Sequence, residues 1–150
     1  MTFRTRRLRA AAVVAGLALA TVGLVPAQAA QAYDDDCTIR QFGPIQYWYH
    51  SNFDGALSCQ NGTVRDLSSP PTYFNKIDTA RAHPRDGLGK QLWNDAGSAE
   101  NHDMNCLATI WFKVGYQGDH VTLNRFGQPN WYSANLGPVN NNNRSQNWAC

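Results

Sequence analysis

The chain has 150 residues, with 13 basic side chains, 11 acidic side chains and four cysteines. Four of the arginines lie within the first nine residues, so the rest of the chain carries nine basic against eleven acidic side chains, a net charge of −2. This balance argues against nucleic acid and anionic membranes as partners, because both call for a basic surface.

The N-terminus predicts a secretory signal peptide over residues 1–29. Arg4, Arg6, Arg7 and Arg9 precede an apolar stretch from Ala10 to Val25, which is followed by the small-residue pattern Ala27-Gln28-Ala29. A basic, then apolar, then small-residue order is typical of secretory leaders. The apolar stretch is shorter than the ~20 residues that span a bilayer, so we expect a secreted, extracellular protein with no membrane contact after signal removal. Cleavage after residue 29 and after residue 32 are both open, because Ala30-Gln31-Ala32 repeats the pattern.

The cysteines predict two disulfide bonds, because an even number in a small secreted domain is typical of a disulfide framework. They are Cys37, Cys59, Cys106 and Cys150. Three pairings are open, and we favour Cys37 with Cys59 and Cys106 with Cys150, since each bridge then closes one half of the chain. The spacings contain no C-x-x-C and no Cys/His cluster, which argues against zinc and thiol redox chemistry.

The rest of the chain favours strands and turns. Aromatic and β-branched runs at Ile45–Tyr49, Thr109–Val114 and His120–Leu123 predict strands. Ser68–Pro71 and His83–Gly87 are loop signals, and residues 75–82 predict one or two helical turns. We expect one all-β domain over residues 33–150, because a chain of this length buries about two thirds of its surface around a single core.

An internal repeat relates Tyr47–Gly55 to Ile110–Gly118. In each copy a tryptophan, Trp48 or Trp111, is followed five residues later by an aromatic residue and two residues further on by glycine. The repeat predicts a strand whose aromatic side chain enters the core. The following turn folds back so that the second aromatic covers the first, and glycine supplies a backbone angle that other residues resist.

A matching Asn-rich turn follows each copy, at Asn94–Ala99 and at Asn141–Gln146. Both read Asn, then Asn or Asp, two free positions and Ser. Asn and Asp side chains bond to nearby backbone groups, which is sufficient to explain a turn. Clustered oxygen atoms of this kind also suit Ca²⁺, which takes 6–8 oxygen ligands.

Together these features resemble the Greek-key motif of the βγ-crystallins, two of which make one domain. The chain as a whole resembles the secreted actinobacterial proteins grouped as peptidase inhibitor family I36. The resemblance implies a βγ-crystallin-like Greek-key sandwich of two repeated motifs, at about 41–103 and 104–150, with a long connection between Gly55 and Asn94. It implies a peptidase inhibitor whose partner is a secreted protease. The alternative is an extracellular calcium- or cell-wall-binding module without inhibitory activity.

The resemblance also implies calcium ligands. Backbone carbonyls would come from Ala96 and Asn143 and hydroxyls from Ser98 and Ser145, with Asn94, Asp95, Asn141 and Asn142 shaping or ligating the sites. The sequence departs from the family pattern at Ala99 and Gln146, where serine is usual. Because Asp95 is the one carboxylate in the two turns, we expect weak calcium binding, on the order of 10⁻⁴–10⁻³ M.

Other features give weaker guidance. The segment Asn61–Gly89, with the Pro-rich Ser68–Thr72, offers an exposed loop for a protease cleft, although no reactive-site residue can be matched to the family. Four histidines lie near aspartates in the sequence: His50, His83, His102 and His120. No G-x-S-x-G or H-E-x-x-H motif accompanies them, so we expect no enzymatic activity. We also expect a monomer. Trp48 and Trp111 are expected in the core. Trp93, Trp131 and Trp148 suit either the core or a binding surface, such as one for carbohydrate.

Overall fold

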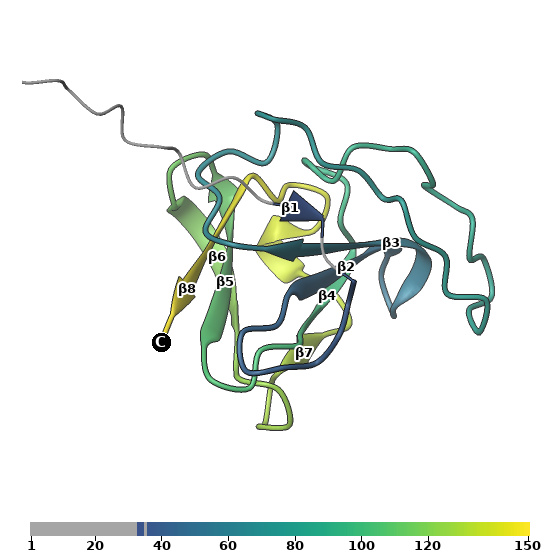
Figure 1. Ribbon diagram of the computed structural model, residues 1–150. Helices are drawn as coiled ribbons and strands as arrows, with labels where there is room; N and C mark the ends of the chain where they lie inside the picture. Colours follow the sequence, from purple (N-terminus) through teal and green to yellow (C-terminus); the bar gives the residue numbers. More distant parts are fainter. Residues whose placement is uncertain (1–32, 35) are drawn as a thin grey trace, which may run out of the picture.

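A computed structural model describes residues 33–34 and 36–150 of the chain, so the predicted signal peptide lies outside the described residues. The strands, shown in Figure 1, are β1 (Tyr33–Asp34), β2 (Ile45–His50), β3 (Asp54–Asn61), β4 (Ser98–Asn101), β5 (Leu107–Lys113), β6 (Gln117–Leu123), β7 (Tyr132–Ser133) and β8 (Ser145–Ala149). A 3-10 helix, η1, spans Gly137–Val139. Within the described part of the chain, no helix has the length and apolar character that a membrane crossing requires.

The strands form two antiparallel sheets. The larger sheet has the order β1-β3-β2-β4-β7 and the smaller one the order β6-β5-β8. Each half of the chain contributes a hairpin, β2–β3 or β5–β6, and a later strand that pairs with the first strand of that hairpin. Trp48 lies opposite Ser98 in one sheet, and Trp111 lies opposite Ser145 in the other.

The two halves exchange one segment each, as a Greek-key arrangement requires. Strand β7 comes from the second half but pairs with β4 of the first, placing Ser133 opposite Ala99. In return, Val64 of the first half forms an antiparallel bridge with Gln146 of β8. The chain is therefore an all-β Greek-key sandwich built from two repeated motifs, which confirms the predicted fold class.

The main core fills the space between the two sheets. Ile45 and Tyr47 of β2 and Ala108 and Ile110 of β5 are fully buried in it, at alternate positions of each strand. Alternation of this kind is expected where one face of a strand packs inward. The predicted strands are present, with β5 beginning two residues earlier and β6 three residues earlier than the runs suggested.

Trp48 is buried, as predicted, whereas the prediction that Trp111 lies in the core is wrong because its side chain is half-buried. Trp48 is buried in a second, smaller cluster with Leu57 and Cys59, and Phe53 packs against its ring at 5.3 Å. Trp111 is half-buried and packs on His120 at 4.4 Å. The residue before each tryptophan, Tyr47 or Ile110, is the one that faces the main core.

Both hairpin turns use the backbone angle that the repeat predicts at glycine. Gly55 and Gly118 have φ of 85° and 80°, in the left-handed region that glycine adopts at little cost. The second aromatics, Phe53 and Tyr116, also have positive φ, at 59° and 63°. Bulky residues rarely adopt these angles, so the surrounding contacts must stabilise both turns.

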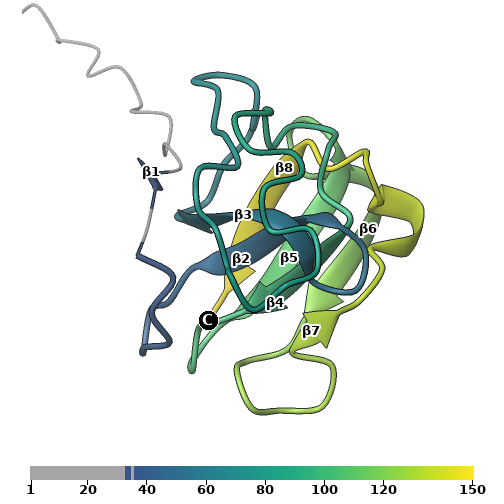
Figure 2. The same cartoon turned by 90° about the vertical axis from the view of Figure 1, so that its right-hand side faces the viewer.

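The long connection of the first motif carries no regular secondary structure between residues 62 and 97. Figure 2 shows it as a teal trace over the larger sheet. The helical turns predicted over 75–82 are absent, because Lys76 instead pairs with Leu57 of β3 through two backbone hydrogen bonds of 3.0 Å. The disulfides join Cys37 to Cys59 and Cys106 to Cys150, the pairing favoured from the sequence.

Candidate functional site

The two Asn-rich turns lie against each other where the motifs meet. The backbone N–H of Asn94 donates to the carbonyl of Asn143 over 3.0 Å, and the N–H of Asn141 donates to the carbonyl of Ala96 over 2.9 Å. Asn94 and Asn141 have φ of 64° and 52°, which asparagine tolerates better than most residues. The fold thus brings the two predicted turns together through a reciprocal pair of hydrogen bonds.

Amide side chains strengthen this contact. Asn143 is fully buried, accepts a hydrogen bond from the Ala96 N–H at 3.0 Å and donates one to the Leu92 carbonyl at 2.8 Å. The side-chain oxygen of Asn94 accepts a bond of 3.0 Å from Arg144. These bonds join the turns to each other, which is the turn-forming role that the sequence offered as one interpretation.

The serines at the fifth position of each turn hold the opposite hairpin turn of their own motif. The Ser98 hydroxyl donates to the His50 carbonyl at 2.7 Å and accepts from the Phe53 N–H at 3.0 Å. The Ser145 hydroxyl makes the matching bonds, to the Lys113 carbonyl at 2.7 Å and from the Tyr116 N–H at 3.1 Å. These bonds stabilise the two aromatic residues with positive φ.

Of the predicted calcium ligands, Ala96, Ser98, Asn143 and Ser145 are fully buried, whereas Asn94, Asp95, Asn141 and Asn142 are partly or fully exposed. The Asp95 side chain is half-buried, and within the described residues its carboxylate has no hydrogen-bond partner. The carbonyls of Ala96 and Asn143 already accept the hydrogen bonds that join the two turns. Asn142 uses its amide N–H to bond the Asn140 carbonyl at 3.1 Å, leaving its side-chain oxygen available. Calcium binding stays a prediction, and no cluster of three or more His, Cys, Asp or Glu side chains suited to a metal occurs in the described part.

Two histidine–aspartate contacts attach the connection to the β2–β3 hairpin. His83 lies 2.7 Å from the Asp54 carboxylate, which also accepts a 2.9 Å bond from the His83 backbone N–H. His50 lies 3.2 Å from Asp86, so the two pairs connect the β2–β3 hairpin to residues 83–86 of the connection. The side-chain hydrogen bond from His83 lowers the pKa of Asp54 to about 2, and the same bond raises the pKa of His83 above its ordinary 6.5.

A surface feature that the sequence did not single out lies in the loop between β6 and β7, residues 124–131. An open pocket of about 350 Å³ is lined by Leu107, Asn124, Arg125, Gln128 and Pro129. The sequence signals only a turn here, at Gly127-Gln128-Pro129-Asn130. It does not signal the pocket, because Leu107 comes from a distant strand.

Comparison with known proteins supports the fold. No family model and no curated protein matches the chain. A solved structure described as "Evolution of the eye lens beta-gamma-crystallin domain fold" is similar, with a TM-score of 0.54 and 17% sequence identity. The match covers 79% of this chain and 97% of that one. The chain therefore has the βγ-crystallin domain fold, and at this level of identity the likeness extends to the fold alone.

Proposed function

We propose that this protein is a secreted, non-enzymatic peptidase inhibitor that presents the connection of its first motif to a protease. Equivalent positions in the two motifs show where that connection is inserted. Leu67 corresponds to Leu136, because both are fully buried and each donates its backbone N–H to the carbonyl of the fourth residue of an Asn-rich turn, Arg144 or Gly97. Residues 68–93 stand between Leu67 and Asn94, whereas only residues 137–140 separate Leu136 from Asn141.

The observation that carries this proposal is that the long connection is ordered. Phe74 and Leu92 are fully buried in the main core. Their backbones bond across the connection, from the Phe74 N–H to the Lys90 carbonyl at 3.0 Å and from the Leu92 N–H to the Thr72 carbonyl at 2.9 Å. Long loops without regular structure are usually functional or disordered, and this one is held in place.

Two of the exposed stretches of the connection, which we call the first and second tips, are candidates for contact with a protease. The first, at Ser69–Pro71, follows a turn in which the Asp66 carboxylate accepts hydrogen bonds from the N–H and hydroxyl of Ser68, at 2.9 and 2.6 Å. The second tip, Thr79–Ala80, lies between Asp78 and Arg81, which form an ion pair with each other. A loop that is already ordered enters a cleft with a smaller loss of conformational entropy, as an inhibitor requires.

The second tip is tied to the sheet through Arg81 and His83. Arg81 pairs with Asp78 at 2.8 Å, and its guanidinium group lies 5.6 Å from the centre of the Trp48 ring. His83 binds Asp54 immediately after the tip. The attachment of both flanks makes Thr79–Ala80 the better candidate for contact with a protease.

The test is to titrate the secreted protein against a panel of secreted serine and metalloproteases. We expect near-stoichiometric inhibition of at least one, and a loss of at least tenfold in affinity when Ala80→Trp places a bulky side chain at the second tip. Ser69→Trp tests the first tip, and Val114→Trp in the β5–β6 hairpin is the matched control. Absence of inhibition across the panel would overturn the proposal, as would inhibition that neither tip variant changes.

A further inference from the structure

Four aromatic side chains form a continuous row across the outer face of the larger sheet, which we call the aromatic row. Phe53 contacts Tyr132 at a ring separation of 5.7 Å, Tyr132 contacts Trp131 at 5.2 Å, and Trp131 contacts Phe126 at 4.6 Å. Each pair meets edge to face, the arrangement that aromatic rings prefer. The row joins the hairpin of the first motif to the 124–131 loop of the second.

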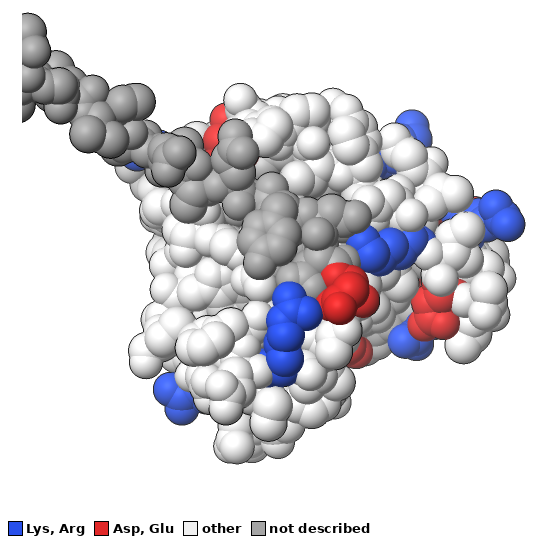
Figure 3. All heavy atoms as spheres, in the orientation of Figure 1, with Lys and Arg blue, Asp and Glu red and all other residues white. Residues whose placement is uncertain are grey.

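The row lies at the edge of the sheet and is accessible. Tyr132 is 50% exposed in β7, the edge strand, while Phe53, Phe126 and Trp131 are half-buried. In Figure 3 the lower end of the molecule, where β7 and the 124–131 loop lie, shows mostly uncharged residues. The charged residues beside the row are Arg125, which is exposed next to Phe126, and Glu100, which lies opposite Tyr132 in the sheet.

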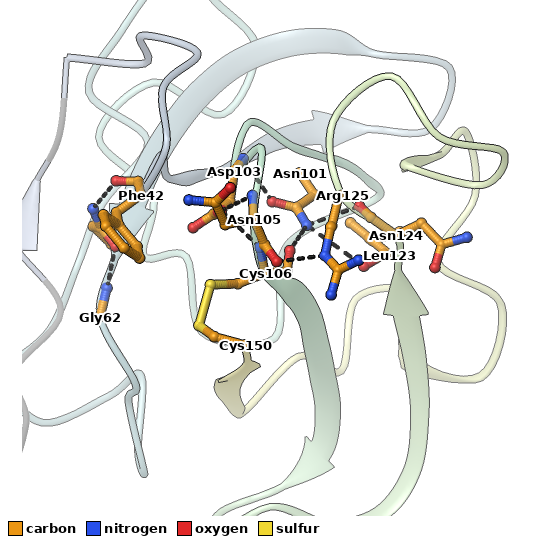
Figure 4. The surroundings of a disulfide bond; sticks show 11 residues. Phe42, Gly62, Asn101, Asp103, Asn105, Cys106, Leu123, Asn124, Arg125 and Cys150 are labelled. Carbon is orange, nitrogen blue, oxygen red and sulfur yellow. Dashed lines mark hydrogen bonds between the residues drawn. A yellow bond between two sulfur atoms is a disulfide. The ribbon is translucent and has the colours of Figure 1, made fainter.

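The 124–131 loop, which also lines the pocket, is fixed at its base by the junction of the two motifs (Figure 4). The Asn101 amide donates to the carbonyls of Asn124 and Cys106, at 2.8 and 2.9 Å. The Asp103 carbonyl accepts a 2.7 Å bond from the Phe126 N–H, and the Arg125 side chain donates to the Asn105 carbonyl. The Cys106–Cys150 disulfide lies beside these contacts. The rings and the pocket are thus preorganised.

The polar groups around the rings are mainly amides. The exposed residues that flank the rings along the chain include Asn52, Gln128, Asn130 and Asn135. The carboxylates nearby are already engaged: Glu100 with His102 at 3.1 Å, and Asp54 with His83. Amides both donate and accept hydrogen bonds, which suits a ligand that carries neutral hydroxyl groups.

We propose that the aromatic row and the pocket of the 124–131 loop bind a neutral polysaccharide. The C–H groups of a sugar ring carry partial positive charge and pack on the electron-rich face of an aromatic ring. The hydroxyl groups at the rim of the sugar then bond to amides, and a pocket of this size is within the range of small-ligand sites. The row runs from the β2–β3 turn through Tyr132 of the edge strand to the 124–131 loop, so it offers successive ring contacts to an extended sugar chain. The Phe53 end of the row adjoins the connection, because Phe53 packs on Trp48 and Arg81 lies over the same ring, whereas Tyr132 and the 124–131 loop belong to the second motif.

The experiment is a pull-down of the secreted protein on cellulose, chitin, curdlan and insoluble starch, followed by titration with a soluble oligosaccharide of whichever polymer retains it. We expect retention on at least one polymer, and quenching or a shift of tryptophan fluorescence on titration. Tyr132→Ala should weaken binding at least tenfold, because it removes the most exposed ring. Tyr132→Phe should bind within twofold of the parent, since the ring is kept, and Gln128→Ala should bind several-fold more weakly.

The matched control is Tyr73→Ala, which removes a tyrosine of similar exposure, 43%, from the connection. It should leave polysaccharide binding unchanged, and Tyr132→Ala should leave protease inhibition unchanged. The proposal is overturned if none of the four polymers retains the protein, or if the Tyr73 and Tyr132 variants weaken retention equally. Retention that 0.5 M NaCl abolishes would also overturn the proposal, because it would indicate charge pairing with Arg125. Binding to a cell-wall protein and to none of the polysaccharides would overturn it as well.

Discussion

The phenol of Tyr47 donates a hydrogen bond of 2.9 Å to the side-chain oxygen of Gln146, and both residues are fully buried. Tyr47 belongs to β2 and Gln146 to β8, so the bond joins the two sheets through the core. The Gln146 amide N–H donates to the Gly62 carbonyl at 2.9 Å. Gln146 occupies a position where the βγ-crystallin pattern has serine, and its longer side chain reaches a partner in the other motif.

Removing this phenol should destabilise the fold. Tyr47→Phe leaves the Gln146 oxygen buried without a partner, which costs about 1–3 kcal/mol of unfolding free energy. Urea denaturation of the secreted protein measures the change, and Tyr73→Phe, at an exposed position, is the control. A stability equal to that of the control would mean that the Tyr47–Gln146 bond contributes nothing net.

The serines of the two turns should be equally important. Ser98→Ala and Ser145→Ala each remove one donor and one acceptor from a hairpin turn, and we expect each to cost about 1–3 kcal/mol. The two losses should agree closely, because the two hydroxyls make matching bonds. Ser69→Ala, at an exposed loop position, should be near neutral in the same denaturation series. A large loss at one serine and none at the other would show that the two hairpins are held differently.

The His83–Asp54 pair should make stability depend on pH. The raised pKa of His83 stabilises the fold fully below pH 6.5 and less as pH rises through the folded pKa. The lowered pKa of Asp54 stabilises it fully above pH 3.8 and less as pH falls towards 2. Denaturation of the parent, His83→Gln, Asp54→Asn and the double variant should therefore differ most between pH 3.8 and 6.5.

In that series the double variant should lose no more stability than Asp54→Asn alone, because the Asp54 change already breaks the pair with the His83 side chain. If the difference in unfolding free energy between the parent and His83→Gln were the same at pH 5 and at pH 9, the assigned role of the imidazole charge would be wrong.

Calcium should bind weakly if the paired turns ligate it. We expect heat on calorimetric titration with Ca²⁺, with a dissociation constant on the order of 10⁻⁴–10⁻³ M, and a higher melting temperature with calcium than with EDTA. Asp95→Asn should remove most of the effect, because it removes the one carboxylate of the two turns. Asp119→Asn, on the exposed strand β6, is the control. No heat and no melting shift at millimolar Ca²⁺ would end the calcium hypothesis.

Much of the architecture could be predicted from local patterns in the sequence. Alternating aromatic and β-branched residues predict strands β2 and β5, since the strand period is short and local. The spacing of Trp48 and Gly55, repeated at Trp111 and Gly118, predicts two copies of one hairpin. These features depend on residues close together in the chain, and the structure reproduces them.

Local patterns in the sequence indicate two copies of an aromatic hairpin, each followed by an Asn-rich turn, and four cysteines that can crosslink the two halves. The direction in which each side chain faces, and the distant groups that it meets, depend on how the chain packs. The tertiary structure turned Trp48 outward under Phe53, paired Lys76 with Leu57 where a helical turn was predicted, and assembled Leu107 and Gln128 around one pocket. The physical reason is that these contacts join residues far apart in sequence, so their energy depends on how the two sheets pack rather than on any local pattern.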